Sequence, residues 1–343
     1  MTSHSVEPTG SIGNTLPDTM RAIVQDTYGS AEVLRLAQIE VPDVAADEVL
    51  VRVHAAGLDR GTWHLMTGKP YAMRLALGFR GPKNPVSGLD VAGVVVAIGS
   101  KVSRFSIGDE VFGFGKGTFA DYAVARVDKV ALKPANMTFE QAAAVPVSAA
   151  TALQALCDSG RIENGQSVLV IGASGGVGTY AVQLAKALGT EVTGVCSAGK
   201  ADLVRSLGAD HVIDYAQQDF ADDDQRFDLI LDIAGNPSPS HLRRALTPKG
   251  TAVIVGGEEG GNMTGGMGRQ LRALMLSVVV RQRLTMFIAK QRAADLERIA
   301  GFLAAGTITP SLDRTYPLEQ APEAMRRLEA GDVRGKIVIT VVV

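Results

Sequence analysis

Short apolar runs that are typical of strands recur in the first third of the chain. Glycines separate these runs, as turns between the strands of a small barrel do. The pattern predicts a β-rich segment from Arg21 to about Lys133. Its strongest strand signals are Arg21–Val24, Val49–Val53, Val91–Ile98 and Glu110–Phe114.

The middle of the chain, from about Val147 to Ala305, instead alternates unbroken apolar runs with segments of helical spacing. A strand buried on both faces is apolar throughout, and alternation with helices is typical of a doubly wound parallel sheet. The pattern therefore predicts an α/β unit with helices on both faces of its sheet. The predicted strands are Ser167–Ile171, Glu191–Cys196, His211–Ile213, Phe227–Asp232 and Thr251–Val255.

After Thr309 the chain becomes extended again and ends in the β-rich segment Lys336–Thr340. Because both flanks are β-rich, the simplest topology inserts the α/β unit into a β-rich domain. We expect residues 20–146 and 309–343 to form the β-rich domain and residues 147–308 the inserted one. Residues 1–19 are rich in Ser, Thr, Gly and Pro, lack an apolar run and are predicted to form a flexible tail.

A glycine-rich run, Gly172–Gly178, joins the predicted strand Ser167–Ile171 to a helical pattern that extends from Gly176 to Leu188. Glycines at such a turn let the backbone approach a pyrophosphate, and the helix N-terminus offers free N–H groups. The run departs from the usual G-x-G-x-x-G pattern at Ala173. We interpret it as a dinucleotide-binding turn rather than as a purely structural one. The predicted contacts are Ser174, Gly175, Gly176 and Val177.

The end of the next strand, Glu191–Cys196, indicates which dinucleotide binds. An acidic residue there would bind a ribose hydroxyl, but the chain continues with Ser197 and, three residues on, Lys200. A hydroxyl and a cation suit a 2′-phosphate, which a carboxylate would repel. The pattern favours NADPH over NADH. The alternative for Lys200 is a solvated lysine at the start of a helix.

Composition narrows the classes of partner. The 343 residues have a net charge of −2, so there is no electrostatic case for binding nucleic acid or an acidic membrane surface. The two cysteines cannot form a disulfide framework or a multi-thiolate metal site. The longest strongly apolar stretch, Leu274–Val280, is shorter than the ~20 residues that a membrane helix needs. We expect a cytoplasmic protein.

Several segments together resemble the medium-chain dehydrogenase/reductase superfamily, and most of all its zinc-independent quinone oxidoreductase branch. The resemblance extends from Met20 to Val343 and implies a GroES-like β-barrel domain, an inserted Rossmann domain, and a cleft between them for nicotinamide and substrate. The segments that carry it are Ala55–Asp59, Pro85–Gly93, Gly108–Val111, Ala143–Pro146, Gly172–Gly178 and Arg334–Lys336.

The resemblance also places Leu89 and Val147 where zinc-dependent relatives have metal ligands, and neither side chain can ligate zinc. We therefore expect no metal, and a protein group must act on the substrate oxygen instead. The resemblance points to the loop that contains Asp59, His64 and Tyr71. The alternatives are that His64 is a packing histidine and that Asp59 caps the short helix that follows.

Further cofactor contacts are implied by the resemblance alone; they are Thr151, Tyr215, Ala234, Gly256 and Lys336. The expected function is NADPH-dependent reduction of a small hydrophobic quinone, enone or other carbonyl compound. Two alternatives stay open. One is an NAD(P)-dependent alcohol dehydrogenase or carbonyl reductase, and the other is an NADPH-sensing protein without turnover.

Two features near the end of the α/β unit lead to softer expectations. Glu258–Gly268 is rich in glycine, and Arg269–Lys290 has a helical, partly apolar pattern. A loop and helix of this kind suit a substrate lid or a subunit contact, or simply a core helix after a long loop. The resemblance also implies a homodimer, in which Thr251–Val255, otherwise an exposed apolar sheet edge, would pair across a two-fold axis.

Overall fold

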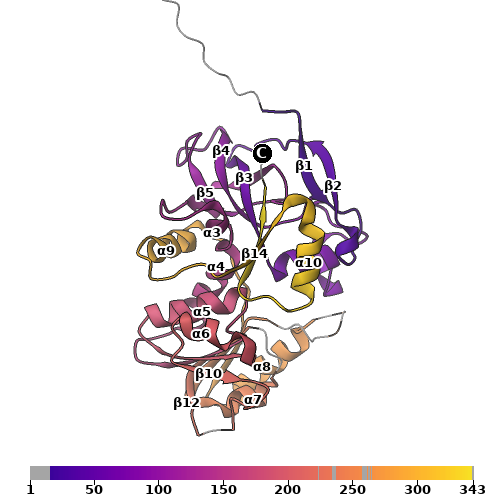
Figure 1. The fold of residues 1–343 in the computed structure, drawn as a ribbon. Helices are drawn as coiled ribbons and strands as arrows, with labels where there is room; N and C mark the ends of the chain where they lie inside the picture. The colour runs from indigo at the N-terminus through magenta and orange to yellow at the C-terminus, as the bar shows by residue number, and fades with distance from the viewer. Residues whose placement is uncertain are drawn as a thin grey trace, which may run out of the picture.

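The computed structural model describes residues 16–222, 224–233, 237–256, 261, 263 and 265–341. Most of the predicted tail, residues 1–15, lies outside this range, as does Ala234. The described chain forms two large sheets, one in the upper half of Figure 1 and one in the lower half. A separate two-stranded sheet pairs β1 with β2 (Thr19–Val24 and Arg35–Glu40).

The upper sheet has seven strands and is built from both flanks of the chain. Its order is β14-β15-β3-β4-β5-β7, and β6 also pairs with β3. All of its pairs are antiparallel except β14 with β15. The strands are β3 Glu48–Leu58, β4 Asp90–Ile98, β5 Glu110–Phe114, β6 Tyr122–Arg126, β7 Val130–Leu132, β14 Leu312–Pro317 and β15 Lys336–Thr340.

The lower sheet has six parallel strands in the order β10-β9-β8-β11-β12-β13. The chain starts at β8 in the middle, builds outward to β10, and then returns to the other side of β8. This order confirms the predicted doubly wound sheet, whose ligand crevice lies at the carboxyl ends of the central strands. The strands are β8 Ser167–Ile171, β9 Glu191–Cys196, β10 His211–Asp214, β11 Phe227–Asp232, β12 Leu246–Ile254 and β13 Arg283–Met286.

Helices cover the sheets and join the two halves. The start of α4 lies where the halves meet, and all its residues but one are buried, because its alanines allow close packing. It continues into a π-helical turn, Ala155–Gly160. The helices are α1 Arg60–Thr67, α2 Arg74–Leu77, α3 Phe139–Ala143, α4 Pro146–Gln154, α5 Gly176–Ala187, α6 Ala201–Ser206, α7 Pro239–Arg244, α8 Met267–Val279, α9 Ala293–Ala304 and α10 Ala321–Glu329. Among the described residues, no helix is long and apolar enough to cross a membrane.

Two sequence-based expectations are wrong near the edge of the parallel sheet. The helix predicted for Arg269–Lys290 ends at Val279, and the chain then forms β13, which pairs with β12. Thr251–Val255 is therefore not the sheet edge; β13 is. The backbone N–H and C=O groups along the outer edge of β12 can form hydrogen bonds with a neighbouring strand but not with a helix. The β-branched residues before β13 also disfavour continuation of the helix.

A third expectation fails in the C-terminal segment, which was predicted to be extended after Thr309. The chain does form β14 and β15, but α10 lies between them, on the right of Figure 1. Its buried face is formed by Ala321, Ala324 and Met325. These few apolar positions pack against the rest of the β-rich half, although most of the helix is polar.

Candidate active site

The turn between β8 and α5 is shaped by close backbone approach. A Cβ on Gly178 would lie 2.1 Å from the carbonyl oxygen of Gly172, so only glycine fits there. A Cβ on Gly175 would meet only that same oxygen, at 3.5 Å, so the space outside Gly175 is open. The first N–H groups of a helix have no intrahelical acceptor. The four predicted contacts, from Ser174 to Val177, therefore surround a cradle that can hold a phosphate.

The C-terminal strand closes against this turn. The N–H of Gly335 donates to the carbonyl of Ser174 at 2.9 Å, and Gly335 forms a bridge with Gly175. Lys336 follows directly and is only 2% exposed. A Cβ on Gly176 would lie 3.1 Å from Cδ of Lys336. The Lys336 side chain thus runs beneath the turn and carries its charge into the junction between the two halves.

The Lys336 ammonium faces two buried carboxyl groups. Its Nζ lies 3.2 Å from Oδ2 of Asp90 and 3.9 Å from Oδ2 of Asp59. Asp90 is fully buried and Asp59 is 7% exposed. The three residues lie at the same end of neighbouring strands, because β15 pairs with β3 and β3 with β4, all antiparallel. We refer to Asp59, Asp90 and Lys336 as the ionic cluster.

Each carboxyl group of the ionic cluster has one further contact. Oδ1 of Asp90 accepts from the N–H of Val147 at 2.9 Å, in the first turn of α4. Oδ1 of Asp59 accepts from the N–H of Thr62 at 2.9 Å, which confirms that Asp59 caps α1. Oδ2 of Asp59 is buried and has no hydrogen-bond donor among the residues that the structure describes.

Burial raises the pKa of Asp90 to about 7; the Lys336 ammonium opposes this rise, and the negative charge of Asp59 adds to it. Tyr180 on α5 lies behind the cluster and donates its hydroxyl to the carbonyl of Ala144 at 3.2 Å. Burial, and then the charge of Asp90, raise the pKa of Tyr180 well above its ordinary value. Asp90 can therefore gain or lose a proton near neutrality, whereas the phenol stays protonated.

His64 and Tyr71 are oriented by their own loop. Nδ1 of His64 lies 2.7 Å from the carbonyl oxygen of Lys69, which makes Nδ1 the protonated nitrogen. Tyr71 is 38% exposed and packs against the guanidinium of Arg74, 4.4 Å from its ring centre. The guanidinium of Arg74 also lies over the ring of Tyr28, 4.6 Å from its centre. Neither His64 nor Tyr71 belongs to the described cavity lining, although Leu65 does.

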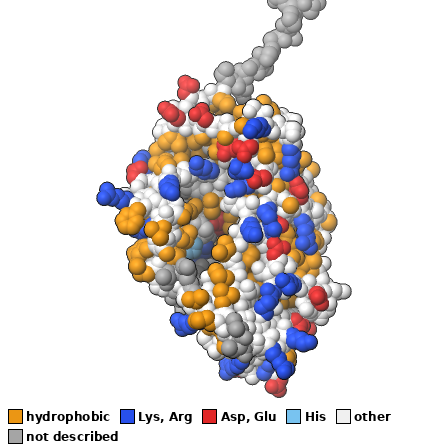
Figure 2. Space-filling model, turned by 180° about the vertical axis from the view of Figure 1, so that it is seen from behind, with side chains coloured by type: hydrophobic (Ala, Val, Ile, Leu, Met, Phe, Trp, Pro, Cys, Tyr) orange, Lys and Arg blue, Asp and Glu red, His pale blue; other side chains and the backbone are white. Residues whose placement is uncertain are grey.

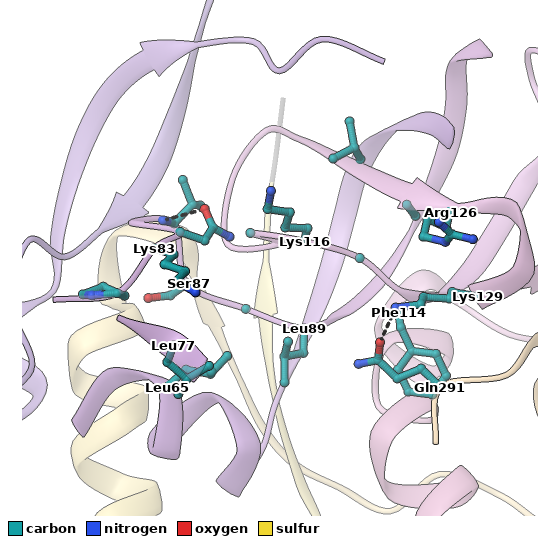
Figure 3. A pocket seen from close by; sticks show the side chains of 18 of the residues that line it. Leu65, Leu77, Lys83, Ser87, Leu89, Phe114, Lys116, Arg126, Lys129 and Gln291 are labelled. Carbon is teal, nitrogen blue, oxygen red and sulfur yellow. Dashed lines mark hydrogen bonds between the residues drawn. The ribbon is translucent and has the colours of Figure 1, made fainter. Parts of the chain in front are cut away.

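A cavity of about 390 Å³ opens between α1, the loop before β4, the strands β5 and β6, and Gln291 of the other half. Leu65 and Leu77 lie on one side of it, Phe114 on the other and Leu89 between them (Figure 3). The face opposite to that of Figure 1 is hollowed near its middle, with hydrophobic side chains beside the hollow (Figure 2). Basic side chains also line the cavity: Lys83, Lys116, Arg126 and Lys129.

The cavity and the ionic cluster adjoin each other. Leu89 lines the cavity, while the next residue, Asp90, belongs to the cluster. A Cβ on Gly61 would lie 3.2 Å from Cδ1 of Leu89 and 2.9 Å from Oδ1 of Asp59. Because Leu89 carries no ligand atom, the wall at this point is apolar.

The predicted adenosine contacts lie at the carboxyl ends of β9 and β10. Ser197 follows β9, and the N–H of Tyr215 donates to the carbonyl of Cys196 at 3.2 Å, while the Tyr215 side chain is 67% exposed. Lys200 was expected either to face a phosphate or to be solvated, but its ammonium is held by the protein backbone. Its ammonium donates to the carbonyls of Gly331 and Val333, at 3.1 and 3.0 Å. It therefore ties the parallel-sheet half to the C-terminal segment.

The other predicted contacts are placed by helices and strand ends. Thr151 is buried on α4, one turn beyond Val147. Gly256 follows β12, and a Cβ there would lie 1.9 Å from the carbonyl oxygen of Ile233, so the ends of β11 and β12 approach closely. Much of the glycine-rich segment Glu258–Gly268 lies outside the described residues, but Met263 accepts a hydrogen bond from the N–H of Ala72, at 3.1 Å, beside Tyr71.

Sequence reasoning missed two buried carboxylates. One is Asp90, the residue after Leu89. The other is Asp232 at the end of β11, which is fully buried and ion-paired with Arg269 of α8. The available signal was an acidic residue directly beside an apolar strand, which requires a cation from elsewhere in the chain.

Two family models match the chain. Residues 45–135 match the alcohol dehydrogenase GroES-like domain, and residues 207–339 match the zinc-binding dehydrogenase. A 2-methylene-furan-3-one reductase from Solanum lycopersicum is 32% identical, over 94% of this chain and 80% of its own length. An NADPH-dependent alkenal/one oxidoreductase from Arabidopsis thaliana is 31% identical over the same shares. The structure of the quinone oxidoreductase from Coxiella burnetii is 27% identical, with a TM-score of 0.83, and the match covers 94% of this chain and 100% of that chain.

A matched pair of glycine substitutions tests the turn. Gly175→Ala adds a methyl group in open space, so the fold should be kept while a bound pyrophosphate is crowded. We expect NADPH binding to weaken by about 1.4 kcal/mol or more, which is tenfold in Kd. Gly178→Ala should instead cost about 1–3 kcal/mol of unfolding free energy, because its methyl group meets Gly172. Urea unfolding and NADPH titration of both variants test this prediction. Equal losses of unfolding free energy in the two variants would contradict the assignment of Gly175 to the phosphate-binding turn.

The raised pKa of Asp90 predicts how stability depends on pH. The folded chain holds this proton from about pH 4 to pH 7, whereas the unfolded chain releases it near pH 4. The free energy of unfolding should therefore fall as pH rises through this range, by up to about 1.4 kcal/mol per pH unit. Asp90→Asn should flatten this slope, and exposed Asp332→Asn should not. Urea unfolding from pH 5 to pH 8 is the measurement, and parallel curves for Asp90→Asn and the native chain would refute the prediction.

Proposed function

Because the chain belongs to the medium-chain dehydrogenase/reductase superfamily, in its quinone oxidoreductase-like branch, and is an oxidoreductase with a nicotinamide cofactor, we propose that it uses NADPH to reduce a quinone, enone or other carbonyl compound without zinc. The observation that supports this proposal is the open space at Gly175, together with a cavity whose walls are apolar at Leu65, Leu77, Leu89 and Phe114 and which adjoins the ionic cluster. The same arrangement brings a phosphate-binding turn, a buried proton-binding group and a substrate-sized space together.

The dinucleotide, when bound, supplies the hydride. The chain's part is to hold it and to position the acceptor. Ser174 to Val177 would hold the pyrophosphate, Thr151 the nicotinamide end, and Ser197 with Tyr215 the adenosine end. Gly256 has no side chain that would obstruct the dinucleotide where it would cross the end of the sheet. The cavity walls formed by Leu65, Leu77, Leu89 and Phe114 suit a small hydrophobic acceptor.

Independence of zinc is supported by the side chains themselves. Leu89 and Val147 stand where related zinc enzymes have ligands, and neither has a donor atom. The nearby carboxyl groups are already engaged, since Asp59 caps α1 and Asp90 binds Lys336 and the N–H of Val147. Basic groups along the cavity would instead favour the negative charge that develops on a carbonyl oxygen.

Two alternatives are separated by one assay. An alcohol dehydrogenase would oxidise small alcohols with NADP or NAD, and an NADPH sensor would turn over nothing. A screen of quinones, enones, aldehydes and alcohols that follows NADPH absorbance distinguishes all three. We also propose a homodimer, now through the edge of β13 rather than β12. The cytoplasmic location stays a prediction.

Lys200→Ala tests the choice of NADPH. Lys200 would exchange its contacts with Gly331 and Val333 for the 2′-phosphate beside Ser197. Loss of this charge-assisted contact should weaken NADPH binding by about 1–3 kcal/mol and leave NADH binding nearly unchanged. Lys249→Ala, at an exposed lysine of the same half, is the control. If Lys200→Ala weakens both nucleotides equally, Lys200 only ties the two halves together.

His64→Ala and Tyr71→Phe test the proton donor. If either side chain polarises the substrate oxygen, its removal should lower kcat by ~10²–10⁴-fold and leave NADPH affinity unchanged. Tyr28→Phe is the matched control, because Tyr28 packs on the same Arg74 but donates its hydroxyl to the carbonyl of Gly78. Steady-state kinetics of the single and double variants give the answer. A double variant with native kcat and KM would make this loop a pocket wall only.

A further inference from the structure

The ionic cluster contains more acid than base. The charged and titratable groups that face Asp90, among the described residues, are Lys336 from β15, Asp59 from the start of α1, and Tyr180 from α5. The N–H of Val147 on α4 completes its surroundings. With both carboxyl groups ionised, two negative charges would share one ammonium in a place that water scarcely reaches.

An uncompensated charge in such a place is costly, and a carboxyl group avoids the cost by keeping a proton. The raised pKa of Asp90, at about 7, agrees with this expectation. The buried Oδ2 of Asp59 accepts no hydrogen bond from the described residues and lies 3.9 Å from the Lys336 ammonium. Asp90 is the carboxyl group that burial favours in the protonated form, and it lies 3.2 Å from the Lys336 ammonium.

The ionic cluster also lies beside the proposed phosphate site. Lys336 passes beneath Gly176, and Gly335 is hydrogen-bonded to Ser174 in the turn itself. A pyrophosphate in the cradle would bring negative charge close to the ammonium that compensates the two carboxylates. The carboxyl pair would then be less well compensated, and its affinity for a proton would rise.

We propose that Asp59, Asp90 and Lys336 form a proton-loading site, which takes up one proton when the phosphates of the dinucleotide bind the turn between β8 and α5. This inference rests on the proposed function. Reduction of an enone adds a hydride, with its electron pair, to one carbon and a proton to the neighbouring carbon. One proton taken up by Asp90 with each cofactor matches that demand in number, and Asp90 regains it from solvent when the next cofactor binds.

Calorimetry on the full chain tests the proposal without any turnover. NADPH is titrated into the protein at pH 8 in two buffers whose ionisation enthalpies differ, and the difference in heat gives the number of protons taken up. At pH 8 we expect each chain to take up close to one proton when NADPH binds. Uptake should be much smaller at pH 6, because Asp90 is already protonated there. Asp90→Asn should abolish the uptake at pH 8, whereas the exposed Asp332→Asn should retain it.

A second variant keeps the test sharp if Asp90→Asn folds poorly. Asp59→Asn removes the surplus negative charge but leaves Asp90 in place, so the pH of half-maximal uptake should move lower. An unchanged uptake profile in either variant overturns the proposal. NADPH binding without uptake in the native chain also overturns it and leaves the proposed function standing. Failure of NADPH to bind at all would refute the proposed function itself, and this inference with it.

Discussion

The positively charged side chain of Lys336 is buried where the two halves of the molecule meet, and the surrounding strands and turn hold it in that position. Its Nζ lies within 4 Å of both Asp59 and Asp90, at 3.9 and 3.2 Å, while Gly335 is bonded to the glycine-rich turn. A buried ion pair adds little net stability, because desolvation offsets the attraction. Removing one partner is costly, however, because the other charge is left alone. The three charged residues belong to the β-rich half, and the hydrogen bonds from Val147 to Asp90 and from Gly335 to Ser174 connect them to the other half.

This constraint accounts for the insertion of one half into the other. The three charged residues lie at one end of β15, β3 and β4, which are neighbours in the seven-stranded sheet. The end of β3 and the start of β4 come before the parallel sheet in the chain, and β15 comes after it. The returning strand therefore passes the turn between β8 and α5, and Gly335 and Lys336 contact that turn on the way. The turn that we propose to bind phosphate is thus contacted by both halves.

Local patterns predicted the parts of the fold that local interactions determine. Helix α5, strands β8 and β11 and the turn of Gly172–Gly178 follow from apolar runs and glycine spacing, and they were predicted correctly. Strand β13 was missed because its formation depends on the open edge of β12, which no local pattern reveals. The raised pKa of Asp90 was missed for the same kind of reason, since it results from burial in the folded chain and is opposed by Lys336, which lies far along the sequence. The roles of His64 and Tyr71 stay predictions, because a fold alone does not show which group donates a proton.

The distribution of charge near the cavity bears on the kind of substrate. Consecutive residues at the start of β4 serve different sites, since Leu89 lines the cavity and Asp90 the ionic cluster. The carboxyl groups of Asp59 and Asp90 are thereby absent from the cavity lining, in which four basic residues accompany the single carboxylate of Glu48 among the described lining residues. Such an excess of positive charge favours a developing oxyanion. Oxidation of an alcohol needs a base or a metal at its hydroxyl, and the wall at Leu89 offers neither. A conjugated carbonyl or quinone is already electrophilic and requires chiefly a positioned hydride and a proton, which is the chemistry that this division of charge favours.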